Sequence, residues 1–202
     1  MKKLSLQIVA VLVLAGLAAS LYAAPAVGEN VPDFSLPTAD GKTQTLARHK
    51  GKFVVLEWTS PACPFVQRHY AGGHMQRLQT EETAQGVVWL TVDSSAPGKE
   101  GYLSAEQAAA WIKDKGLACT AFLLDPDGTV GRLYGVRATP QVFIISPEGK
   151  LLYAGAVDSI ASADPSDLAK ATNYVRVGLE EARAGKALTT PTTRPYGCSV
   201  KY

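Results

Sequence analysis

The sequence has few of the residues that metal centres and disulfide frameworks require. Its 202 residues include three cysteines, three histidines and two methionines. An odd number of cysteines excludes a framework in which every thiol is paired within the chain. At least one of Cys63, Cys119 and Cys198 must therefore stay free or pair with another molecule.

The chain also lacks an excess of either charge. It has 20 Lys and Arg residues against 18 Asp and Glu, and removal of Lys2 and Lys3 would make the two numbers equal. Because nucleic-acid binding requires a basic excess on one face, we exclude nucleic acid as a partner. The glycines lack the spacing of phosphate-binding loops, and no haem or flavin motif is present, so we expect no cofactor and no resident metal.

Only the N-terminus carries a long apolar run. Residues 1–26 begin with two lysines, continue through an apolar stretch over about 8–19 and end in small residues. This is the pattern of a secretory signal peptide, and we expect cleavage before Val27. An uncleaved segment would also be long enough to anchor the protein in a membrane. The protein is therefore expected to be exported to the periplasm or another extracytoplasmic compartment, where disulfides are permitted.

After the signal, strand and helix patterns alternate, which predicts one α/β domain over residues 27–185. Turn residues around Asp40 and Gly41 predict an N-terminal β-hairpin. Buried strands are expected over 52–59, 87–92, 121–124, 141–145 and 151–156. Helices are expected over 64–85 with a break at the paired glycines, over 104–115 and 129–134, and as one long closing helix over 164–184. Residues 186–202 carry prolines and threonines and predict a flexible, non-helical tail that contains Cys198.

Cys63 lies where a predicted strand meets a predicted helix, in the stretch WTSPACPF (58–65). The free N–H groups and the dipole of a helix N-terminus stabilise a thiolate, so this position should lower the pKa of Cys63. Pro64 suits the first turn of that helix, where no N–H is needed. The pattern favours a redox thiol over an inert buried one.

The strand, SPACP, the helix and the later YGVRATPQVFII together resemble the thioredoxin superfamily, in particular its alkyl hydroperoxide reductase/thiol-specific antioxidant (redoxin) branch. The segments CPFVQRHY and PYGCSVKY are similar to a peroxiredoxin-like subgroup that ends in a GCS-type tail. The resemblance implies a thioredoxin-like α/β sandwich, with helices on a mixed central sheet. It also implies an exported thiol-dependent oxidoreductase that reduces peroxides or exchanges disulfides.

The resemblance further implies roles for individual residues. Thr139 and Pro140 match the segment that carries a cis-proline facing the redox cysteine, and with Trp58 and Pro64 they would shape a substrate groove. Ser60 stands where thioredoxins have their first cysteine, so no local dithiol can form, and its hydroxyl could support the thiolate of Cys63. Arg137 is the nearest match to the arginine of peroxiredoxins.

The missing local thiol raises the question of which group is the partner of Cys63. We expect Cys198 to act as a resolving thiol, with Cys119 as the second choice. A permanent structural disulfide of Cys198 is the alternative, and it would silence the site. The expected partners are a thiol reductant or a disulfide-bearing protein, with a peroxide as a further possible substrate.

Two other functions remain open from the sequence. His69, His74 and Met75 follow Cys63 and invite the hypothesis of a copper-handling protein, since imidazole, thioether and thiolate suit copper. On one helix their spacing would turn them to different faces, and we expect the two histidines to face solvent. The third hypothesis is a redox-inactive adaptor that uses the cis-proline groove only to bind peptides.

Overall fold

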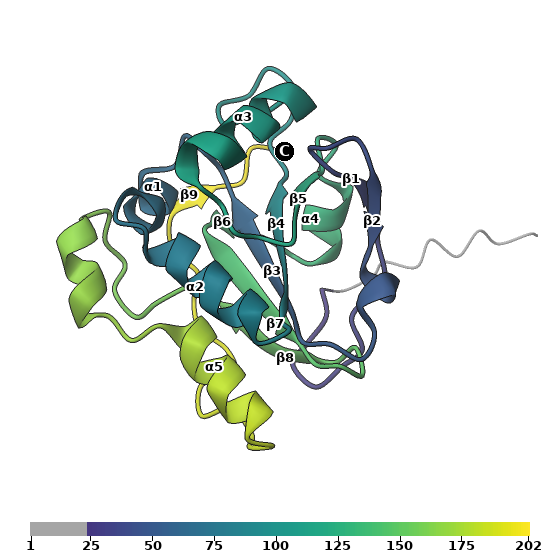
Figure 1. The fold of residues 1–202 in the computed structure, drawn as a ribbon, viewed down its shortest axis with the longest axis vertical. Helices are drawn as coiled ribbons and strands as arrows, with labels where there is room; N and C mark the ends of the chain where they lie inside the picture. Colours follow the sequence, from purple (N-terminus) through teal and green to yellow (C-terminus); the bar gives the residue numbers. More distant parts are fainter. Residues whose placement is uncertain (1–23) are drawn as a thin grey trace, which may run out of the picture.

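A computed structural model of the chain describes residues 24–202 (Figure 1). The predicted signal peptide therefore lies almost wholly outside the described residues. Within residues 24–202, no helix combines the length and the apolar character that a membrane span requires.

Five strands form the central sheet in the order β5-β4-β3-β7-β8. They are β3 (Val54–Thr59), β4 (Val88–Asp93), β5 (Ala121–Leu124), β7 (Gln141–Ile145) and β8 (Leu151–Gly155). Strands β3, β4 and β5 are parallel, whereas β7 pairs antiparallel with both β3 and β8. The sheet is therefore mixed, and all five strands lie within or next to the predicted ranges.

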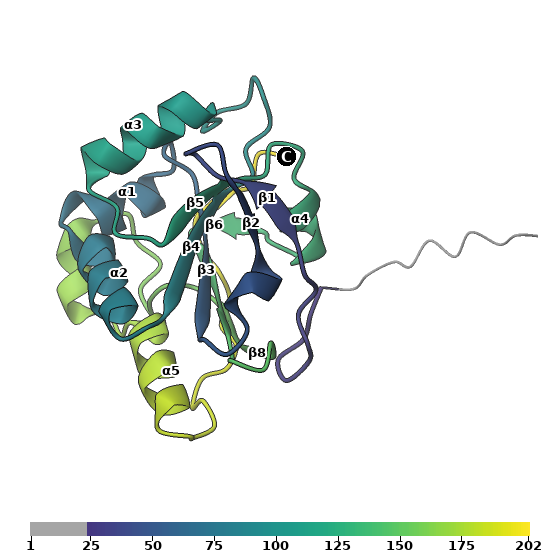
Figure 2. The same ribbon diagram turned by 45° about the vertical axis from the view of Figure 1, so that its right-hand side comes forward.

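Each face of the sheet has its own hydrophobic core because side chains alternate along every strand. Along β3, Leu56 and Trp58 pack toward the N-terminal β-hairpin and α4 (Thr129–Leu133). Val55 packs toward α1 (Pro64–Ala71), α2 (His74–Ala84) and α5 (Tyr174–Arg183). Figure 2 shows these helices on one side of the sheet and the hairpin with α4 on the other. The predicted thioredoxin-like sandwich is confirmed.

The hairpin consists of β1 (Ser35–Pro37) and β2 (Thr43–Thr45), and a 3₁₀ helix (Leu46–His49) follows it. The α-helices are α1 (Pro64–Ala71), α2 (His74–Ala84), α3 (Ala105–Lys115), α4 (Thr129–Leu133) and α5 (Tyr174–Arg183). The break expected within 64–85 is present, because Gly73 adopts the left-handed conformation between α1 and α2.

The prediction of one closing helix over 164–184 is wrong. A 3₁₀ helix (Pro165–Lys170) comes first, with the side chain of Asp164 accepting a hydrogen bond at its start. The chain then becomes extended at Ala171, and the Asn173 side chain accepts from the N–H of Arg176 at 2.9 Å to begin α5. Two side-chain caps thus start two separate helices where the apolar periodicity alone indicated one.

The C-terminal tail is non-helical, as predicted, but it is packed against the domain rather than loose. The N–H of Thr193 donates to the carbonyl of Ala154 on β8 at 3.2 Å, and the N–H of Ala154 donates to the carbonyl of Pro191 at 3.2 Å. Farther on, β9 (Cys198–Ser199) pairs antiparallel with β6 (Ala138–Thr139). In Figure 1 this yellow segment runs past α1 and ends near α4.

Candidate functional site

The central strand β3 leads directly to Cys63. The chain turns after β3, where the N–H of Cys63 donates to the carbonyl of Ser60 at 3.1 Å. Cys63 is the N-cap residue of α1, and Pro64 occupies the first helical position. The thiol therefore lies at a helix N-terminus, in the position predicted from the sequence.

The cis-proline segment closes over this thiol. The Thr139–Pro140 peptide bond is cis, and the thiol of Cys63 donates a hydrogen bond to the carbonyl of Thr139 at 3.0 Å. Cys63 is only 2% exposed. The juxtaposition expected between the cis-proline segment and Cys63 is present.

Cys198 reaches the same place from the end of the chain. In the pairing of β6 with β9, Thr139 lies opposite Cys198. Gly197 has a φ of +122°, and a Cβ at this position would collide with the carbonyl oxygen of Thr139. Glycine thus allows the tail to approach the same carbonyl that accepts from Cys63.

Cys63 and Cys198 line one pocket of about 280 Å³. Its wall also includes Ser60, Pro64 and Thr139, with Glu100 and Lys201 as its charged residues. Cys119 is not among the lining residues, and all three cysteines are free thiols in the structure. Of the two alternatives for a partner of Cys63, the geometry favours Cys198.

The two thiols of this pocket differ in acidity. Burial raises the pKa of Cys63, but the thiol of Cys198 and the backbone N–H groups of Val66 and Cys198 lower it by more, so that it lies below its ordinary value. Burial and the neighbouring Cys63 together raise the pKa of Cys198 to about 11. At neutral pH, Cys63 is therefore the better nucleophile of the pair.

Other predicted site residues differ in their distance from this chemistry. Ser60 is buried in the pocket wall, and its side chain packs against Gly101, where a Cβ would collide with it. Arg137 is exposed and does not line the pocket. Trp58 is fully buried and donates from Nε1 to Ser94 at 3.0 Å, so its ring belongs to the core rather than to a groove wall.

The prediction that both histidines face solvent is wrong for His69, which is 2% exposed. Burial lowers the pKa of His69 to about 4, so it is neutral at physiological pH. His74 is half-buried, and it lines a pocket of about 150 Å³ together with His69 and Met75. His69 lies on α1, whereas His74 and Met75 lie on α2, so the three side chains can line one pocket despite their spacing. Neither Cys63 nor Cys198 lines this pocket. Among residues 24–202, no group of three or more His, Cys, Asp or Glu side chains could hold a metal ion.

A buried polar cluster beside the site was not identified from the sequence. Arg68 on α1 is fully buried and forms an ion pair with Asp158 at 3.2 Å. The hydroxyl of Tyr196 donates to Asp158 at 2.6 Å and accepts from Arg68 at 3.1 Å. The cluster therefore connects the helix that begins at Cys63 with the tail that carries Cys198. The arginine alone gave no signal, because a charged residue on a helix is usually solvated.

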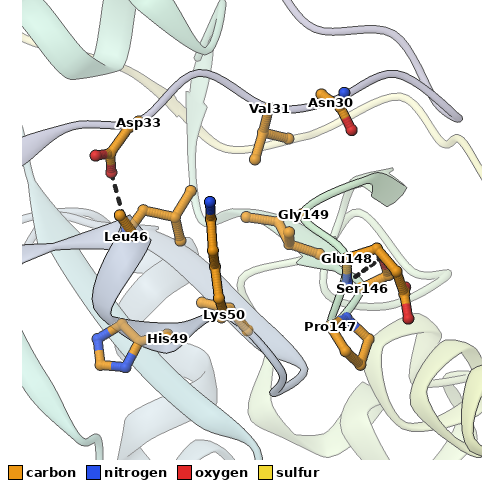
Figure 3. Close-up of a pocket in the computed structure, with 13 residues that line it drawn as sticks. Asn30, Val31, Asp33, Leu46, His49, Lys50, Ser146, Pro147, Glu148 and Gly149 are labelled. Atoms are coloured by element: carbon orange, nitrogen blue, oxygen red, sulfur yellow. Dashed lines mark hydrogen bonds between the residues drawn. The ribbon is translucent and has the colours of Figure 1, made fainter.

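A second large hollow lies at the opposite end of the sheet. It has a volume of about 360 Å³ and lies between the N-terminal segment, the 3₁₀ helix after β2 and the β7–β8 turn (Figure 3). Its lining includes Asp33, His49, Lys50 and Glu148, but no cysteine. We therefore assign the redox chemistry to the pocket at Cys63.

Comparison with known proteins agrees with this geometry. Residues 27–154 match the model of the AhpC/TSA family. The match includes Cys63 and the cis-proline segment but ends before the tail. A thiol:disulfide interchange protein DsbE from Allochromatium vinosum is 27% identical over 139 residues, which cover 67% of this chain and 70% of that protein.

Solved structures show the same fold. A hypothetical protein from Sinorhizobium meliloti superposes with a TM-score of 0.74 at 24% identity, covering 89% of this chain and 96% of the other. The peroxidoxin BcpB from Mycobacterium tuberculosis superposes with a TM-score of 0.56 at 19% identity, covering 79% of this chain and 97% of the other.

Proposed function

Since this chain belongs to the AhpC/TSA family and is a thiol-dependent oxidoreductase of the thioredoxin superfamily, we propose that Cys63 and Cys198 form its redox couple. The observation that carries the proposal is the meeting of these two thiols, with opposite shifts in pKa, in one pocket. The role of Cys198 is not implied by the family match, because the matched region ends before it.

The favoured reaction is thiol–disulfide exchange. The Cys63 thiolate attacks one sulfur of a substrate disulfide, so that a Cys63–substrate disulfide forms and the other substrate half leaves as a thiolate. The Cys198 thiol then loses its proton and attacks the sulfur of Cys63. The second substrate half leaves as a thiol, and a Cys63–Cys198 disulfide remains. The name of the Allochromatium relative supports this class of reaction.

Peroxide reduction is the second candidate, supported by the fold shared with a peroxidoxin. The Cys63 thiolate would attack one peroxide oxygen and become a sulfenic acid, while the other oxygen leaves as an alcohol or water after taking a proton. Cys198 would then condense with the sulfenic acid, release water and form the same disulfide. Both routes end in one product and require an external thiol reductant.

We further propose that this reaction takes place outside the cytoplasm, in the periplasm or an equivalent compartment. The signal-like residues 1–26 support this location. Its partners there would carry thiols or disulfides, as the interchange activity named for the relative implies.

Disulfide mapping by mass spectrometry tests the redox couple. The mature protein would be mapped before and after one equivalent of glutathione disulfide or hydrogen peroxide. We expect a Cys63–Cys198 disulfide to form only after the oxidant is added, in the wild type and equally in the control Cys119→Ser. With glutathione disulfide, Cys198→Ser should stop at a Cys63–glutathione adduct, and Cys63→Ser should not react.

Two outcomes would contradict the proposal. A Cys63–Cys119 disulfide would show that Cys119, and not Cys198, is the partner thiol. A Cys63–Cys198 disulfide that is present from the start and resists mild reductants would indicate the structural staple and, with it, the adaptor hypothesis.

A further inference from the structure

The tail occupies the strand edge beside the redox thiol. In the antiparallel pairing of β6 with β9, Ala138 lies opposite Ser199 and Thr139 opposite Cys198. An extended polypeptide that bound next to Cys63 by strand addition would use the same N–H and C=O groups of β6. The protein's own C-terminal segment 196–202 already takes this place.

This segment is fastened on its N-terminal side by Tyr196. Its hydroxyl bonds to both members of the buried Arg68–Asp158 ion pair. Its ring packs against Phe65 on α1, with the ring centroids 5.9 Å apart. Tyr196 therefore attaches segment 196–202 to the helix that begins at Cys63.

The segment is fastened again on its C-terminal side. The Tyr202 hydroxyl donates to the carbonyl of Val136 at 3.1 Å, and the guanidinium of Arg132 lies 4.4 Å from the centre of the Tyr202 ring. Gly128 and Gly131 leave the space that this ring fills, because a Cβ at either position would collide with it. Attachment at both ends makes release of the strand edge costly.

We propose that segment 196–202 is a specificity element that restricts direct oxidants of Cys63 to small molecules, namely low-molecular-weight disulfides or hydroperoxides, and excludes extended polypeptides. The pocket of about 280 Å³ beside both thiols leaves room for such a molecule while the strand edge stays occupied. Tyr196 is a positioning residue in this arrangement, since it acts by holding the segment. The inference rests on the proposed function, in which Cys63 is the attacking thiol.

Two probes with one leaving group test this selectivity. In both probes a cysteine is joined to thiopyridine by a disulfide. In the small probe this cysteine is N-acetylcysteine amide. In the other it belongs to a peptide of about ten residues with capped ends, which is long enough to add a strand. The protein carries Cys119→Ser and Cys198→Ser, so only Cys63 reacts. Its thiolate attacks the cysteine sulfur of the probe, the probe disulfide breaks, and thiopyridone leaves and is followed by absorbance. Rates are normalised to those of each probe with glutathione.

In this parent protein we expect the small probe to react about tenfold or more faster, because the peptide can react only from a minor state with the edge free. Gly197→Ala forces the tail away from the Thr139 carbonyl and should reduce the difference to about twofold by speeding up the peptide. Gly185→Ala is the control: it also places an alanine at a positive φ, of +69°, but a Cβ there meets nothing within 4 Å. It should keep the full difference between the probes.

Tyr196→Phe provides a second test that keeps the ring against Phe65 and removes only the hydroxyl. Tyr196→Phe should reduce the rate difference between the two probes, but by less than Gly197→Ala does. If circular dichroism shows that Gly197→Ala does not fold, a reduced rate difference in Tyr196→Phe is the test of the inference. Equal normalised rates for both probes in the parent protein would overturn the inference. A parent protein whose two reactions both persist after Cys63→Ser would instead remove Cys63 as nucleophile and overturn the proposed function.

Discussion

At the residue level, the pKa values of Cys63 and Cys198 shift in opposite directions. Burial raises both, but at Cys63 the hydrogen bonds from the Cys198 thiol and from backbone N–H groups outweigh burial, whereas at Cys198 the neighbouring Cys63 adds to it. The Cys198 thiol lowers the pKa of Cys63, and Cys63 in turn raises the pKa of Cys198. The neutral Cys63 thiol also donates to the Thr139 carbonyl, a bond that is lost on ionisation. The stabilised thiolate of Cys63 therefore depends on the donors that face it.

Removal of the Cys198 thiol should make Cys63 less acidic. We expect Cys198→Ala to raise the pKa of Cys63, because a donor to the thiolate is lost, whereas Cys198→Ser keeps a hydroxyl donor and should leave the pKa closer to that of the wild type. The rate of alkylation of Cys63 by iodoacetamide, measured against pH in a Cys119→Ser background, gives this pKa. In the Ala variant, the rate should begin to fall at a higher pH as the solution is acidified. Identical profiles for the Ala and Ser variants would contradict this role of Cys198.

At the level of elements, the buried carboxylate of Glu57 joins β3 to its neighbours. It accepts from Tyr70 on α1 at 2.7 Å, from Gln79 on α2 at 3.1 Å, and from Trp89 and Thr91 on β4 at 2.8 and 3.2 Å. Four donors are satisfied by one side chain in the middle of the strand that leads to Cys63. Buried donors that lose their acceptor cost free energy, so this group should be important for stability.

Replacement of Glu57 should therefore lower the free energy of unfolding, and the loss should be larger when fewer hydrogen-bond acceptors remain. Glu57→Ala leaves the donors without a partner and should lower the free energy of unfolding by roughly 3 kcal/mol or more. Glu57→Gln keeps one acceptor oxygen and should cost less, about 1 kcal/mol at neutral pH. Urea unfolding of both variants against the wild type measures these differences, and equal losses would show that the hydrogen bonds of Glu57 contribute little.

The same residue gives a pH dependence with a defined sign. Burial raises the pKa of Glu57 in the folded protein, although the four hydrogen bonds oppose this. In the unfolded chain, Glu57 has an ordinary pKa of about 4.3 and loses its proton as the pH rises through this value. The folded protein still holds the proton, so the stability of the wild type falls with rising pH until the folded pKa of Glu57 is passed. Glu57→Gln lacks this effect. Its stability relative to the wild type should therefore improve from pH 4 upward, at about constant ionic strength.

The predictions from sequence succeeded where local patterns determine the structure. Apolar runs predicted the strands, and the junction of strand and helix next to Pro64 predicted that Cys63 lies at a helix N-terminus. They failed where distant segments decide the outcome. Asn173 breaks the closing helix by capping a new one, and buried His69 has the distant Asp158 beside it, with 3.9 Å between Nε2 and the carboxylate. The packing of the tail could not be predicted either, because it depends on Gly197 meeting a carbonyl from another part of the chain.

At the level of the whole molecule, the tail gives the two sulfurs of an oxidised Cys63–Cys198 pair different exposure to a reductant. Cys63 is buried under the cis-proline segment, whereas Cys198 is half-buried on the tail. Attack on the Cys198 sulfur releases Cys63, which has the lower pKa and is therefore the better leaving group. Exposure and leaving-group strength both favour Cys198 as the site of attack.

An incoming thiol should therefore form its mixed disulfide with Cys198. When the oxidised protein, in a Cys119→Ser background, is treated with reduced glutathione and quenched by alkylation at early times, we expect glutathione on Cys198 and alkylated Cys63. The early adducts should favour Cys198 by about tenfold, since a thiol of lower pKa leaves faster and the attacked sulfur is more accessible. Arg137→Ala is a suitable control, because Arg137 is exposed and does not line the pocket of the two thiols. Early glutathione adducts mainly on Cys63 would mean that the reductant reaches the buried sulfur, and the tail would then not direct the reductant to Cys198.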